Sequence, residues 1–84
     1  MVVKYSKIFT VTNVSGEPVT VLIEVIGPDN KIAITTLEGG YSSADELEVA
    51  FYLGNSKSRS FLPMTLIGAR RIVDSLNEAI QVSG

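Results

Sequence analysis

The spacing of hydrophobic residues changes along the chain from a period of two to a period near 3.6. Residues 2–14, 19–26 and 31–37 are rich in β-branched and aromatic side chains, and their apolar residues alternate as in strands. Turn-forming residues separate these segments at 15–18 and 27–30. The pattern therefore predicts three strands joined by short turns, as in an antiparallel meander.

The last stretch, Thr65 to Val82, has the periodicity of an amphipathic helix. Its apolar residues fall in one arc of roughly 140° on a helical wheel, wide enough for a stripe that faces a core. The arc contains Leu66, Ala69, Ile72, Val73, Leu76, Ala79 and Ile80. Thr65 follows Pro63 and can cap the first free N–H groups of the helix. Gly68 falls on the polar side of the wheel, where close packing against the sheet does not explain it.

Residues 46–53 have two interpretations. As a strand, they alternate between apolar and polar positions, with the acidic residues on one face. As a helix, they would begin at a capping box formed by Ser43 and Glu46 and would end at Gly54. The strand is favoured by residues with high β propensity, which are Val49, Phe51 and Tyr52.

With this strand, the predicted fold class is α+β. We expect one domain over residues 1–84, with a hairpin loop at 54–58 and a short fifth strand at 59–62. A single antiparallel sheet of four to five strands would form a meander, and the C-terminal helix would pack on one of its faces. The other face would hold more apolar residues than a solvated face needs: Ile8, Leu22, Ile26 and Leu37. A partner or a second copy of the chain could cover them, and we therefore expect a homodimer.

Composition removes several classes of function. The chain has neither Cys nor His, so the commonest general base and the best nucleophile are absent. No metal-ligand spacing or phosphate loop occurs. No apolar run is long enough to span a membrane, and the N-terminus lacks the features of a signal peptide. We expect a cytoplasmic protein that is not an enzyme, with no catalytic residues, cofactor or bound metal.

Charged residues supply two candidate binding sets. The acidic set would lie along the predicted fourth strand and could dock on a basic partner: Asp45, Glu46 and Glu48. The basic set would gather near the hairpin loop and the start of the helix: Lys57, Arg59, Arg70 and Arg71. Asp74 lies within reach of both helical arginines and could offset their charge. The basic set could bind phosphate or an acidic protein surface, although the net charge of −2 and pI near 4.9 disfavour nucleic acid.

The sequence thus predicts a small non-enzymatic module for protein–protein interaction. Its partner would be a larger protein, as for inhibitors encoded by phages or mobile elements that dock on a host protein. The alternative is a nucleic-acid-binding accessory protein that uses the basic set. The sequence identifies neither the partner nor the biological process.

Overall fold

The structure is a computed structural model, and it describes residues 2–53 and 64–84. The elements follow the order β1 (Val2–Thr12), β2 (Pro18–Gly27), β3 (Lys31–Glu38), α1 (Ala44–Tyr52) and α2 (Leu66–Ser83). Within the described residues, the three strands form one antiparallel sheet in the order β1-β2-β3. The α+β class and the meander of the first three strands are therefore confirmed.

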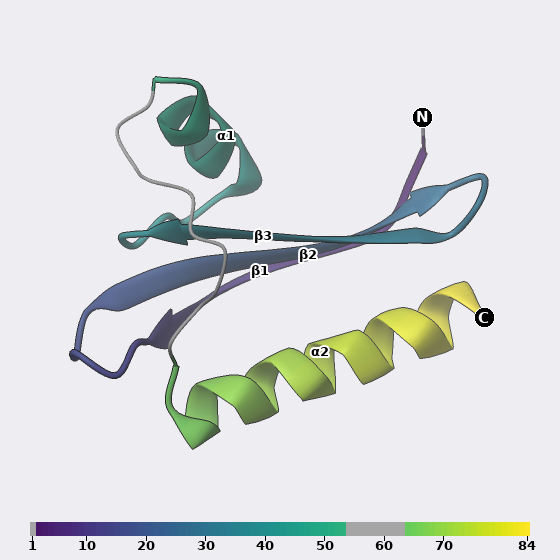
Figure 1. Cartoon of the computed structure of the whole chain (residues 1–84). Coiled ribbons are helices and arrows are strands. Elements are labelled where there is room, and N and C mark those ends of the chain that lie inside the picture. Colours follow the sequence, from purple (N-terminus) through teal and green to yellow (C-terminus); the bar gives the residue numbers. More distant parts are fainter. Residues whose placement is uncertain (1, 54–63) are drawn as a thin grey trace.

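The two helices lie on opposite faces of the sheet, so the molecule has three layers (Figure 1). On one face, α2 packs over a cluster of buried residues from β1 and β2: Phe9, Val11, Val19, Val21 and Ile23. On the other face, α1 contributes Leu47 and Ala50 to a second cluster with Leu22 and Leu37. The prediction of a single helix, packed on one face of the sheet, is not confirmed, because a second helix, α1, covers part of the other face.

The predicted fourth strand is also wrong, since residues 44–52 are helical. The capping box considered as an alternative is present: the Glu46 amide donates a hydrogen bond of 3.2 Å to Ser43 Oγ. Ala44, Leu47 and Ala50 are spaced three apart and face the sheet together, which the strand interpretation concealed. The predicted hairpin loop at 54–58 and the fifth strand at 59–62 lie outside the described residues.

The helix α2 begins where the sequence predicted. Thr65 is its N-cap, and its hydroxyl accepts a 3.1 Å hydrogen bond from the Gly68 amide. The buried side of α2, however, is turned away from the centre of its apolar arc. Gly68 and Ser75, assigned to the polar side, are buried, whereas Leu66 is 90% exposed.

Contacts with β1 explain this rotation of α2. A Cβ on Gly68 would lie 3.2 Å from Val11 Cβ, so glycine allows the helix to approach the strand closely. Ser75 Oγ lies 3.1 Å from the Tyr5 hydroxyl, which gives the buried serine a hydrogen-bond partner. The expectation that close packing does not account for Gly68 is therefore wrong.

β2 is the central strand and is buried from both sides. Val21, Ile23 and Val25 face α2, and Leu22 faces α1. Because its neighbours on either side are β1 and β3, the sheet has two edges, and neither is paired with another described strand.

Candidate functional site

An open groove lies beside α1, on the sheet face opposite α2. It has a volume of about 570 Å³, within the range of about 300–1,000 Å³ that is usual for ligand pockets. Its walls come from α1 and from all three strands: Val3, Leu22, Glu24, Ile26, Thr35, Ala44, Leu47, Glu48 and Tyr52. In Figure 1, α1 lies over one end of this face of the sheet, and the groove lies between α1 and the strands.

A buried threonine fixes the segment that leads into α1. Thr20 Oγ1 donates a 2.7 Å hydrogen bond to the Gly39 carbonyl and accepts one of 2.9 Å from the Tyr41 amide. Gly39 has φ of 108°, a conformation that glycine adopts without strain. The chain therefore turns off β3 at a defined point, and this turn sets the position of α1 over Leu22 and Leu37.

The start of α1 is held by a carboxylate. Glu46 Oε2 accepts hydrogen bonds from the Ser42 amide at 2.9 Å and from Ser42 Oγ at 2.8 Å. These two hydrogen bonds lower the pKa of Glu46. The bond from the Ser42 amide has the larger effect, and the bond from the Ser42 hydroxyl is second. Glu46 therefore caps the helix and is not part of the groove.

The structure separates the predicted acidic set. Glu48 lines the groove, Glu46 binds Ser42, and Asp45 is exposed in the first turn of α1. On a helix these residues point in different directions, whereas a strand would have placed Glu46 and Glu48 on one face. Of this set, Glu48 is the one that the structure brings to the groove.

The basic set is also divided. Arg71 Nη1 donates to the Thr10 carbonyl at 2.5 Å, and its guanidinium lies 4.9 Å from the centre of the Phe9 ring. Arg70 is exposed on the neighbouring position of α2. Asp74 forms no ion pair with either arginine, although all three residues are described. Lys57 and Arg59 lie outside the described residues.

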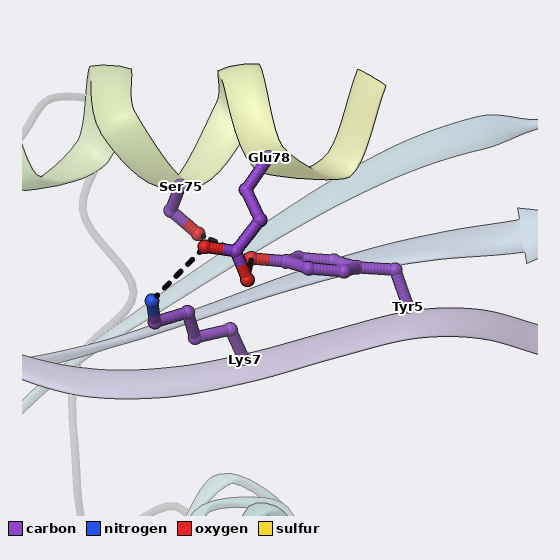
Figure 2. A network of polar contacts seen from close by, with 4 residues as sticks. All are labelled: Tyr5, Lys7, Ser75 and Glu78. Atoms are coloured by element: carbon purple, nitrogen blue, oxygen red, sulfur yellow. Dashed lines mark hydrogen bonds and ion pairs between the residues drawn. The ribbon is translucent and has the colours of Figure 1, made fainter. Parts of the chain in front are cut away.

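A polar cluster joins α2 to β1 on the other face of the sheet (Figure 2). The Tyr5 hydroxyl lies 3.1 Å from Ser75 Oγ and 3.3 Å from Glu78 Oε1, and Lys7 Nζ lies 3.5 Å from Glu78 Oε2. These groups satisfy one another, so we assign them a structural role in positioning α2.

Glu48 is the one groove residue that was a sequence candidate, and Glu24 and Tyr52 are the most informative of those that were not. Glu24 is a single charge within the otherwise apolar and threonine-containing strand β2, and Tyr52 ends α1. The signal for Glu24 was its isolation among residues that are buried on both sides. Tyr52 could be placed at the groove only after residues 44–52 were known to be helical.

Among residues 2–53 and 64–84, no three acidic side chains converge in a way that could hold a metal ion. No helix in the same part of the chain has the length and apolar character needed to cross a membrane. No protein-family model, curated protein or solved structure matches this chain. The groove is therefore interpreted from its own geometry and chemistry.

Proposed function

We propose that the protein is a non-enzymatic interaction module that receives an apolar segment of a larger protein in the groove beside α1. The observation that carries this proposal is the lining of the groove. Its floor is formed by apolar side chains of β2 and α1, chiefly Leu22, Ile26 and Leu47. A groove of this kind suits the apolar side of an amphipathic helix.

The charges beside the groove indicate the chemistry of its partner. Glu24 on the sheet and Glu48 on α1 both line it, and none of the described lining residues is basic. Complementary charges increase association rates and select among partners. The partner segment should therefore carry Lys or Arg beside its apolar residues.

The exposed end of α1 supports the same proposal. Tyr52 lines the groove and is 83% exposed, and Val49 and Leu53 are also large apolar residues exposed on or next to α1. Aromatic residues that are partly open to solvent are frequent anchors at protein interfaces. These side chains would extend the contact beyond the groove itself.

The alternative, binding of nucleic acid, has less support. It depends on four cations, of which Arg71 already contacts Phe9 and the Thr10 carbonyl. If nucleic acid were the ligand, affinity would fall steeply as salt is raised. It would also fall when Arg70 is replaced by alanine.

A pair of designed peptides tests the proposed function. One is an amphipathic helix of Leu and Lys, and the other has Glu in place of every Lys. We expect the Leu/Lys peptide to shift the amide NMR signals of the groove residues, and the Leu/Glu peptide to bind at least about tenfold more weakly because of charge repulsion.

Variants then locate the binding. Glu24→Lys combined with Glu48→Lys should weaken binding of the Leu/Lys peptide, whereas Glu17→Lys, an exposed carboxylate in the β1–β2 turn, should not. Equal binding of both peptides, or equal effects of the two sets of variants, would contradict the proposal. Signal shifts confined to α2 would also contradict it.

A further inference from the structure

Thr20 lies on the same face of β2 as the groove floor, but it is not one of the lining residues. Its side chain is fully buried, with 0% exposure. Valine has the same branched shape and would avoid the cost of burying a hydroxyl group. The hydroxyl of Thr20 therefore has a role that packing alone does not explain.

The chain between β3 and α1 is bound to β2 at three points. The Gly39 amide donates a 2.9 Å hydrogen bond to the Pro18 carbonyl. The Gly39 carbonyl accepts a bond of 2.7 Å from Thr20 Oγ1, and the Tyr41 amide donates one of 2.9 Å to the same oxygen. Because the hydroxyl acts both as donor and as acceptor, it fixes two peptide groups immediately before α1 begins.

The first turn of α1 follows directly from this anchor. Ser42 donates to Glu46 through its amide and its hydroxyl, and Ser43 accepts a hydrogen bond from the Glu46 amide. Tyr41, which is bound to Thr20, and Ser42, which is bound to the helix, are consecutive residues. A displacement of the anchored turn would therefore displace the helix with it.

The anchor acts on one wall of the groove. Glu48 and Tyr52 lie on α1, whereas Glu24 lies on β2, which is paired with a strand on each side. The buried residues of α1, Leu47 and Ala50, hold the helix against the sheet by apolar contacts, which have no preferred direction. Hydrogen bonds are directional, so the bonds of Thr20 set the angle of the helix.

We propose that Thr20 is a positioning residue of the groove. Its hydroxyl orients α1 so that Glu48 on the helix and Glu24 on the sheet face the same bound segment at a fixed spacing. A basic segment meets both carboxylates only while this spacing is kept, so Thr20 selects the partner without touching it. The inference rests on the proposed function, since it concerns the same groove.

Thr20→Val separates the hydroxyl from the shape of the side chain. The variant removes both hydrogen bonds, so α1 can adopt more than one angle and Glu48 no longer has a fixed position. Glu24 stays in place because the strand pairing of β2 is unchanged. Thr20 should therefore be energetically coupled to Glu48 and independent of Glu24.

A double-mutant cycle with the Leu/Lys peptide measures this coupling. Glu48→Gln should weaken binding about fivefold in the wild type and less than about twofold in Thr20→Val. Glu24→Gln should have the same effect in both backgrounds, within about twofold. Thr20→Ser retains the hydroxyl and should restore the coupling. Thr10→Val is the matched control, because Thr10 is exposed and lies opposite Thr20 on β1.

Gly39→Ala disturbs the same anchor in a second way. Gly39 has φ of 108°, and a Cβ at this position would lie 3.3 Å from the Tyr41 ring. This variant should reproduce the altered coupling of Thr20→Val, and it provides the same test if Thr20→Val does not fold. Gly40→Ala is its control, since a Cβ there meets no atom within 4 Å. Circular dichroism must show that the variants are folded.

Amide NMR of the protein without peptide separates this inference from the proposed function. In Thr20→Val, the signals of α1 should shift and their hydrogen exchange should accelerate, whereas the signals of α2 should stay in place. If the wild type does not bind the Leu/Lys peptide, the proposed function fails. The response of the α1 amides then decides by itself whether Thr20 positions the helix.

Three results would overturn the inference. One is a set of α1 amide signals that neither Thr20→Val nor Gly39→Ala changes. Another is equal coupling of Thr20 to Glu24 and to Glu48, which would indicate a general loss of stability. The third is a Thr20→Ser protein that behaves like Thr20→Val, since this would exclude the hydroxyl as the cause.

Discussion

β1 and β3 are the edge strands of one sheet, but their outer edges are built differently. β1 has a shift in register between Val3 and Tyr5, two lysines at positions 4 and 7, and a carbonyl at Thr10 that accepts a hydrogen bond from Arg71. Bulges and charged side chains are the usual protection of an edge against pairing. Over the described residues of β3, neither device is present within 32–37.

The helix α2 shows the same difference. Its flank toward β1 carries Arg71 and Glu78, which make polar contacts with the strand. Its opposite flank carries the exposed apolar residues Leu66, Val73 and Ile80. The comparison shows that polar contacts tie α2 to β1, whereas apolar side chains of α2 and β3 are left exposed among the described residues.

The largest expected effect is a loss of stability when a side chain on β1 is truncated, compared with a similar truncation on β3. Phe9→Ala on β1 removes a buried ring and should lower the free energy of unfolding by about 3–5 kcal/mol. Ile34→Ala on β3 should lower it by about 1 kcal/mol in the monomer, because half of this side chain is already exposed. Urea unfolding of dilute protein measures both values. Equal losses would show that the β3 face is covered within one chain.

A second prediction concerns the close approach of α2 to β1. Gly68→Leu would force side-chain atoms against Val11 and should cost about 1–3 kcal/mol of stability. Gly40→Leu is the control, since a Cβ at Gly40 meets no atom within 4 Å. Thermal unfolding should separate the two variants clearly. A neutral Gly68→Leu would mean that α2 can shift away from β1 at little cost.

A third, smaller effect is expected from Arg71→Ala. Loss of the hydrogen bond to the Thr10 carbonyl and of the contact with Phe9 should cost about 1 kcal/mol. Arg70→Ala, one position away and exposed, should change stability by less than about 0.5 kcal/mol. The Arg71→Ala protein should also associate more at high concentration, because its β1 edge is less protected. Light scattering during prolonged incubation would detect this.

The smallest expected effect is the pH response of α1. The pKa of Glu46 is lowered below its ordinary value of 4.5, so its cap is fully effective above that pH. Its contribution to stability should disappear as pH falls through the lowered pKa, when the carboxylate becomes protonated. A carbon-13 NMR titration should find a Glu46 pKa below 4.5 in the wild type.

Ser42→Ala tests the cause of this pKa. The variant removes one of two hydrogen bonds, and the Ser42 amide remains as the stronger donor. The Glu46 pKa should therefore rise only part of the way to its ordinary value. An unchanged pKa would show that the hydroxyl contributes nothing.

Local patterns in the sequence were sufficient to predict the first three strands and the start of α2. The turns at 15–18 and 27–30 contain residues that favour turns, and Thr65 has the local geometry of a cap. Residues 44–52 gave conflicting local signals. The β propensity of Val49, Phe51 and Tyr52 favoured a strand. In the structure the segment is a helix, which Ser43 caps and which buries Leu47 against Leu37.

The buried side of α2 could not be predicted from its own residues. A helical wheel classes Ser75 as polar, and its burial depends on Tyr5, which is 70 positions earlier in the sequence. The groove depends in the same way on where α1 lies over the sheet. Glu48 was a candidate because of its charge, whereas Glu24 and Tyr52 were missed because their shared location is set by tertiary packing.

The central position of β2 has a consequence for the order in which the protein opens. Two small hydrophobic clusters lie on either side of this strand, and β2 is the described element that supplies buried residues to both. Each cluster therefore loses part of its support when the other opens, which couples the unfolding of α1 to that of α2. In hydrogen exchange, the β2 amides should be the last to acquire deuterium, at a rate set by opening of the whole chain.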